Sequence, residues 1–98
     1  MADEAPPESA HHATLQIRNR LGLHARAAVL LVQTAKQFDA EVTVSKDGQQ
    51  VNGRSIMGIM MLAAEQGSSI DVTTSGPQAG AALAAIRELV EAGFNEPE

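Results

Sequence analysis

Residues 14–38 read TLQIRNRLGLHARAAVLLVQTAKQF, and the spacing of the apolar residues changes within this stretch. Over residues 14–19 apolar and polar side chains alternate, which is typical of a strand with one buried face. From Ala25 onward the apolar residues recur at helical intervals, with polar residues between them. Gly22 lies in the loop between the two patterns. The stretch therefore predicts a strand, a loop and an amphipathic helix in that order.

The same two patterns recur along the rest of the chain. Asp47-Gly48 is a strong signal for a hairpin turn between two strands. The remaining elements follow in order: a strand over 41–45, a short strand over 49–51, a helix over 56–64 opened by Ser55, a strand over 69–73, and a helix that starts after Gly76-Pro77 and ends at Gly93. Alternating strands have one wet face. We therefore expect an α+β fold, an open-faced β-sandwich in which three helices cover one face of a four-stranded antiparallel sheet (β-α-β-β-α-β-α).

The composition limits the class of protein. The chain has 98 residues, no cysteine, no tryptophan, no tyrosine and two phenylalanines, so disulfides, thiolate chemistry and base stacking on aromatic rings are not expected. The net charge of -5 comes from the ends, because residues 14–95 are formally neutral. This is not the charge pattern of a nucleic-acid-binding protein. No signal peptide and no run of about 20 apolar residues is visible, so we expect a cytoplasmic protein without membrane insertion.

We expect one domain over residues 14–95. Residues 1–13 lack apolar periodicity and contain Pro6-Pro7, which predicts a flexible tail. Residues 96–98 are expected to form an acidic C-terminal end. His11 and His12 in the tail could hold a metal weakly, or they are two solvated residues; the role of the tail stays open.

His24 lies at or beside the N-cap of the first predicted helix. The first backbone N–H groups of a helix lack partners, and the helix dipole is positive there, so the position suits an anion such as phosphate. A neutral imidazole has a free lone pair and is a competent nucleophile. The amides of Ala25, Arg26 and Ala27, together with the Arg26 guanidinium, could then hold a phosphoryl group on the ring. Alternatively, His24 only caps the helix or packs in the core.

The chain shows no means of making its own phosphoryl donor. It has no glycine-rich nucleotide loop and no cluster of acids for magnesium, and no second metal ligand lies at suitable spacing from His24. We expect no cofactor and no metal. The pattern favours a phosphoryl-transfer intermediate that receives the group from one protein and passes it to another, rather than a self-contained enzyme.

Residues 56–64 contain no polar side chain, which is unusual for a helix on a small domain. We expect Ile59, Leu62 and Ala63 to point inward. Ile56, Met57 and Met60 then form an exposed apolar patch suited to docking partners. The alternative is a helix covered by a loop or by a second copy of the chain. Ser55 is explained as an N-cap, and a regulatory phosphosite is the other interpretation.

The motifs GLHARAA (22–28), SIMGIMMLAA (55–64) and GFNEPE (93–98) together resemble the histidine-containing phosphocarrier (HPr) family of the bacterial phosphoenolpyruvate:sugar phosphotransferase system. The resemblance covers nearly all of residues 14–95. It implies that Enzyme I, charged by phosphoenolpyruvate, phosphorylates His24 on Nδ1 with help from Arg26, and that an EIIA domain takes the group for sugar uptake. It also implies that Ser55 matches the serine modified by HPr kinase/phosphorylase, and that Ile56, Met57 and Met60 match the docking surface.

One position departs from the family pattern. Ala27 stands where the family usually has proline. Alanine is a good helix former and keeps its N–H, so the anion site should survive, although the effect on transfer is open. Two other functions remain: a nitrogen-type or purely regulatory phosphotransferase branch, and a docking module that acts without phosphotransfer. We expect a monomer that binds no nucleic acid.

Overall fold

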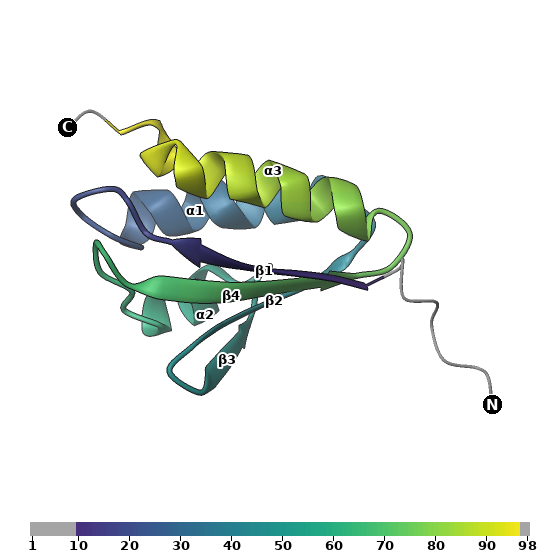
Figure 1. Cartoon of the computed structure of the whole chain (residues 1–98), viewed down its shortest axis with the longest axis horizontal. Coiled ribbons are helices and arrows are strands. Elements are labelled where there is room, and N and C mark those ends of the chain that lie inside the picture. Colours follow the sequence, from purple (N-terminus) through teal and green to yellow (C-terminus); the bar gives the residue numbers. More distant parts are fainter. Residues whose placement is uncertain (1–9, 97–98) are drawn as a thin grey trace.

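The computed structural model describes residues 10–96. Its elements are β1 (Ala10–Gln16), α1 (Ala25–Ala35), β2 (Glu41–Lys46), β3 (Gln49–Asn52), α2 (Ile56–Met61), β4 (Ser69–Ser75), α3 (Ala79–Glu91) and the short 3-10 helix η2 (Gly93–Asn95). The strands form one antiparallel sheet in the order β1-β4-β2-β3. Helices α1 and α3 lie side by side over one face of this sheet (Figure 1), and α2 packs against α1 and β3. The predicted open-faced sandwich is confirmed.

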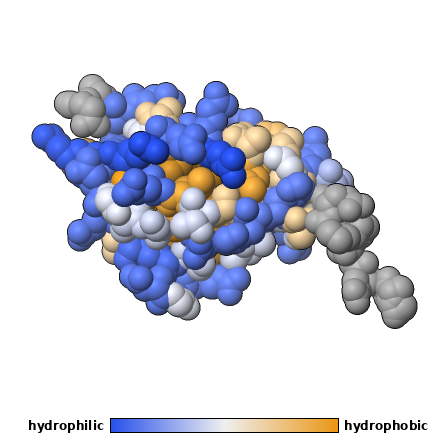
Figure 2. Space-filling view, in the orientation of Figure 1, coloured by the Kyte–Doolittle hydropathy of each residue, from blue (hydrophilic) through white to orange (hydrophobic). Residues whose placement is uncertain are grey.

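The core lies between the helices and the sheet. Alternate residues of each long strand and one stripe of each long helix are buried, as their periodicity predicts. In the view of Figure 2 hydrophilic residues cover most of the surface, and hydrophobic residues show in a band across its middle. The largest fully buried side chain is Phe94, which follows α3. The C-terminal segment is thereby packed against the domain.

The hairpin between β2 and β3 has the two-residue turn that Asp47-Gly48 predicts. Lys46 pairs with Gln49, and the two turn residues have φ angles of 52° and 83°. Positive φ at both turn positions gives the backbone twist that matches the strands. Gly93, directly after the C-cap of α3, also has a positive φ of 64°, so the predicted glycine stop is confirmed.

The first strand begins earlier than expected. The sequence predicted a tail through residue 13, but Ala10–Ala13 belong to β1 and pair with Ser75–Val72 of β4. The prediction was wrong at these residues because the adjacent polar His11 and His12 hide the alternation, while pairing with β4 satisfies their backbone. His12 Nε2 lies 3.6 Å from Asp71 Oδ1, and no group of three or more potential metal ligands occurs among residues 10–96. Residues 1–9 of the expected tail lie outside the described residues.

The second helix is shorter than expected. It ends at Met61 rather than Ala64, and Ala63 is exposed with a φ of 50°, so its predicted inward position was wrong. Ile59 and Leu62 are buried as predicted. The chain turns here because the Ala64 carbonyl accepts a hydrogen bond of 2.9 Å from the Leu23 N–H.

Gly22 is required at this contact. Its φ is 67°, and a Cβ atom on it would lie 2.3 Å from the Ala64 carbonyl oxygen. Only glycine allows the loop before α1 to approach the turn after α2 this closely. The contact sets the path of the chain into His24.

Candidate functional site

His24 is the N-cap residue of α1, as predicted. Its backbone is extended, with φ −76° and ψ −178°, and its ring Nδ1 accepts a hydrogen bond from the Arg26 N–H at 3.3 Å. The lone pair of Nδ1 therefore faces the first turn of the helix. The side chain is 29% exposed, so the ring is open to a partner on one side.

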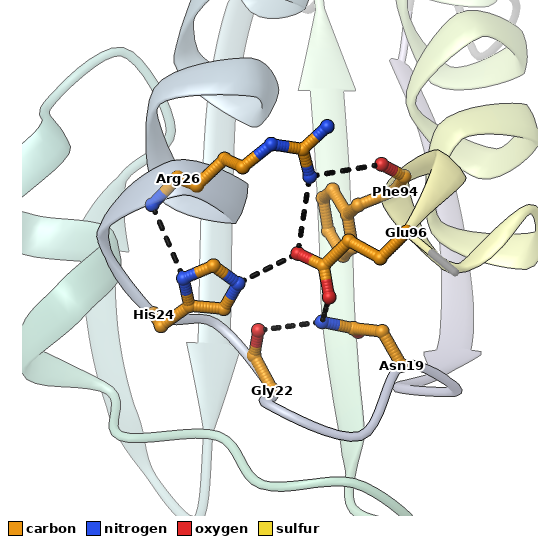
Figure 3. A network of polar contacts seen from close by, with 6 residues as sticks. All are labelled: Asn19, Gly22, His24, Arg26, Phe94 and Glu96. Atoms are coloured by element: carbon orange, nitrogen blue, oxygen red, sulfur yellow. Dashed lines mark hydrogen bonds and ion pairs between the residues drawn. The ribbon is translucent and has the colours of Figure 1, made fainter. Parts of the chain in front are cut away.

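The other ring nitrogen contacts a carboxylate. His24 Nε2 lies 2.6 Å from Glu96 Oε2, 72 residues away in the sequence (Figure 3). An ionised carboxylate only accepts hydrogen bonds, so the shared hydrogen belongs to Nε2. Together with the acceptor role of Nδ1, this contact fits a neutral ring whose hydrogen is on Nε2.

Glu96 is the centre of this polar network. Its side chain is 10% exposed, Oε2 also accepts from Arg26 Nη1 at 3.2 Å, and Oε1 accepts from Asn19 Nδ2 at 3.1 Å. Burial acts to raise the pKa of Glu96, but the hydrogen bonds from His24 and Asn19 and the positive charge of Arg26 outweigh it and lower that pKa below the usual value. The group is therefore a carboxylate at neutral pH.

Asn19 connects the polar network to the loop before α1. It is almost fully buried, and its Nδ2 also donates to the Gly22 carbonyl at 2.8 Å. The residue thus links the loop before α1 to the C-terminal segment. Deeply buried asparagine is uncommon unless it makes such bonds.

Arg26 is held beside the His24 ring. Its Nη1 contacts Glu96 and also the Phe94 carbonyl at 3.4 Å, while most of the side chain is exposed.

The site opens to the surface as a hollow of about 410 Å³, which is lined by Arg20, Leu21, His24, Arg26 and Glu96. Ala25 is exposed and Ala27 is buried in the core. The hollow therefore presents an imidazole nitrogen, two arginines and the start of a helix, which suits a phosphoryl group.

Ser55 is the N-cap of α2, because its Oγ accepts a hydrogen bond from the Gly58 N–H at 3.0 Å.

The apolar side chains predicted to form a surface patch are exposed: Ile56, Met57 and Met60. The sequence did not identify Leu21 and Met61, each 62% exposed, as further apolar surface. Their exposure follows from the loop before α1 and from the early end of α2, which local periodicity does not define.

Sequence reasoning also missed Glu96 and Asn19. Glu96 was assigned to an acidic end, although it lies at the site. The sequence did contain a signal for the position of Glu96, because phenylalanine is usually buried and Phe94 lies two residues earlier. The chain therefore returns to the core just before Glu96. For Asn19 the signal was a polar residue at a buried position of the strand alternation.

Residues 11–92 match the family described as PTS HPr component, phosphorylation site. The chain is 47% identical over 85 residues to phosphocarrier protein HPr of Neisseria meningitidis serogroup A, covering 87% of this chain and 96% of that protein. It is 49% identical over 82 residues to phosphocarrier protein HPr of Xylella fastidiosa, covering 84% and 92% of the two chains. These relatives extend over the predicted domain.

A solved structure agrees with the fold. The crystal structure of HPr-C-His from Thermoanaerobacter tengcongensis superimposes with a TM-score of 0.86 at 41% identity, covering 90% of this chain and 99% of that chain. Within residues 10–96, none of the helices has the length and apolar character needed to cross a bilayer.

Proposed function

Because this chain belongs to the HPr family of phosphocarrier proteins of the phosphotransferase system, we propose that His24 is the residue that carries its phosphoryl group. One observation carries this assignment. His24 Nδ1 faces the start of α1 with its lone pair, while the ring hydrogen on Nε2 is held by Glu96. A nucleophile oriented by a third group is the general pattern of covalent catalysis.

The transfer is a displacement at phosphorus in which the Enzyme I side chain is the leaving group. The Nδ1 lone pair forms a bond to phosphorus as the bond from phosphorus to Enzyme I breaks, and its electron pair stays with Enzyme I. The His24 ring keeps its hydrogen on Nε2 and becomes positively charged. The dianion is stabilised by the N–H groups of Ala25, Arg26 and Ala27 and by the Arg26 guanidinium. An EIIA domain then takes the phosphoryl group by the reverse displacement.

The test is phosphorylation with Enzyme I and labelled phosphoenolpyruvate. Acid-labile, base-stable label on His24 is expected, and its absence from a folded protein with active Enzyme I would leave only a docking module. Adding sugar-specific EIIA should remove the label. Removal by a nitrogen-type EIIA alone would instead favour the regulatory branch.

Arg26→Ala should slow phosphorylation by about ten- to a hundredfold, because a charge-assisted hydrogen bond is worth roughly 1.5–3 kcal/mol. The melting temperature should change little, because the Arg26 side chain is 54% exposed. Rapid-quench kinetics and thermal unfolding measure the two effects. Arg87→Ala removes the same charge from an exposed position of α3 and serves as the control. Equal rates for the two variants would remove Arg26 from the mechanism.

We also propose that the exposed apolar residues Ile56, Met57 and Met60 dock Enzyme I and EIIA. Contiguous exposed apolar side chains commonly mark interaction surfaces, and methionine adapts to several partners. Ser55 directly precedes this surface. A phosphate added there by an HPr kinase would place a dianion at its edge.

Ser55→Asp should weaken binding to Enzyme I by about five- to tenfold, since desolvating a new charge beside an apolar contact costs on the order of 1 kcal/mol. Titration calorimetry measures the affinity. Ser55→Ala removes the cap without adding charge and separates the two effects. If the Asp variant binds as tightly as wild type, Ser55 does not regulate docking.

A further inference from the structure

The carboxylate of Glu96 contacts three other side chains at the site. Three donors from two other parts of the chain converge on its carboxylate: His24 Nε2, Arg26 Nη1 and Asn19 Nδ2. Both oxygens are engaged, and the side chain is largely buried. A carboxylate held this firmly has one orientation with respect to the imidazole.

We propose that Glu96 is a positioning residue for the phosphoryl acceptor, whose carboxylate keeps the ring hydrogen of His24 on Nε2 and so leaves Nδ1 without a hydrogen, as the nucleophile requires. This inference rests on the proposed function of His24. It assigns to the C-terminal segment a role in the reaction rather than in folding alone.

The geometry makes the other tautomer unfavourable. A hydrogen on Nδ1 would face the Arg26 N–H, which is itself a donor, and Nε2 would then present a lone pair to a carboxylate 2.6 Å away. Both contacts would become repulsive. The observed tautomer instead has a short hydrogen bond to an ionised acceptor, which is among the stronger hydrogen bonds in proteins.

The same carboxylate also matches the charge that appears during transfer. When Nδ1 binds phosphorus and Nε2 keeps its hydrogen, the ring becomes cationic, and Glu96 lies in contact with it. The other charged groups that line the hollow are Arg20 and Arg26, both positive. Among the described residues that line the hollow, Glu96 is therefore the acidic side chain that offsets the positive charge of the phosphorylated ring.

The backbone conformation of residues 93–95 determines where Glu96 lies. Gly93, Phe94 and Asn95 have φ angles of 64°, 57° and 59°, and the Glu96 N–H donates to the Gly93 carbonyl at 3.1 Å. Left-handed residues in succession reverse the chain after α3. The buried Phe94 ring anchors this reversal, so the carboxylate is returned to the start of α1.

The experiment compares Glu96→Ala and Glu96→Gln with wild type by ¹⁵N NMR of the His24 ring and by the rate of phosphorylation with Enzyme I. Wild type should show the Nε2–H tautomer. Glu96→Ala should populate the Nδ1–H tautomer and slow phosphorylation by about ten- to a hundredfold. Glu96→Gln keeps one acceptor oxygen without charge and should lie between the two. Glu91→Ala removes an exposed carboxylate from the end of α3 and should match wild type.

The readouts separate the two proposals. If wild type is phosphorylated on His24 but both Glu96 variants keep its tautomer and rate, the positioning role is wrong and the carrier function stands. If wild type is not phosphorylated by active Enzyme I, the carrier function is wrong, while the tautomer shift still tests the contact with Glu96. Should Glu96→Ala fail to fold, a wild-type tautomer and rate in Glu96→Gln would overturn the positioning role.

Discussion

Replacing His24 with Ala is expected to abolish acid-labile labelling of the protein by Enzyme I and phosphoenolpyruvate. The variant loses the imidazole whose Nδ1 faces the start of α1. His11 and His12 lie in strand β1, and His12 is beside Asp71 of the sheet, so neither is the N-cap residue of a helix as His24 is. Because the nucleophile itself is removed, labelling should fall to background. Label counting and tryptic mapping measure the loss.

A matched variant separates chemistry from folding. His24 also caps α1, and loss of an N-cap costs about 1 kcal/mol. His24→Asn keeps a strong capping side chain but has no ring nitrogen, so it should keep α1 capped, lose only the contact with Glu96, and be as unlabelled as His24→Ala. His12→Ala should label normally. Acid-labile label on His24→Asn would show that the phosphoryl group is carried elsewhere.

Phe94→Ala is expected to lower the free energy of unfolding by about 3–5 kcal/mol, the usual cost of removing a large buried aromatic side chain. Phe94 is fully buried in the core, although it lies outside the long helices and strands. The φ of 57° at position 94 is unfavourable for phenylalanine and alanine alike, so the expected loss of stability comes from the lost packing. Urea unfolding measures the change. The variant should also lose the contact between Glu96 and His24, visible in the ¹⁵N signals of the ring.

The second phenylalanine of the chain is the natural control. Phe38 lies after α1, is half-buried and does not belong to the core cluster. Phe38→Ala should therefore destabilise the protein by much less, on the order of 1 kcal/mol. Equal effects of the two substitutions would contradict the packing of the C-terminal segment described above.

Local patterns in the sequence predict most of the architecture. Alternation in the strands, helical spacing after Ala25 and the Asp47-Gly48 turn each depend on neighbouring residues, and the structure confirms all three. The caps His24 and Ser55 are local in the same sense, since each bonds to an N–H two or three residues away. The sequence also predicts that Ile56, Met57 and Met60 of α2 are exposed and that Ile59 is buried, and the structure confirms both.

Local patterns fail where the backbone pairs across the fold. The start of β1 depends on β4, and the end of α2 depends on the Leu23 N–H that bonds to the Ala64 carbonyl. Neither partner is visible in the periodicity of the segment concerned. Backbone groups must be satisfied wherever they become buried, so distant segments move the boundaries of these elements.

By itself, then, the sequence determined the layers of the sandwich and the position of His24 at a helix start, because both follow from residue spacing and capping over a few positions. Only the tertiary structure decided what surrounds the ring. Glu96 lies 70 residues or more from Arg26, His24 and Asn19, and no pattern within one segment connects them. Burial of Phe94 brings the C-terminal chain back to α1, so the hydrophobic core sets the electrostatics of the site.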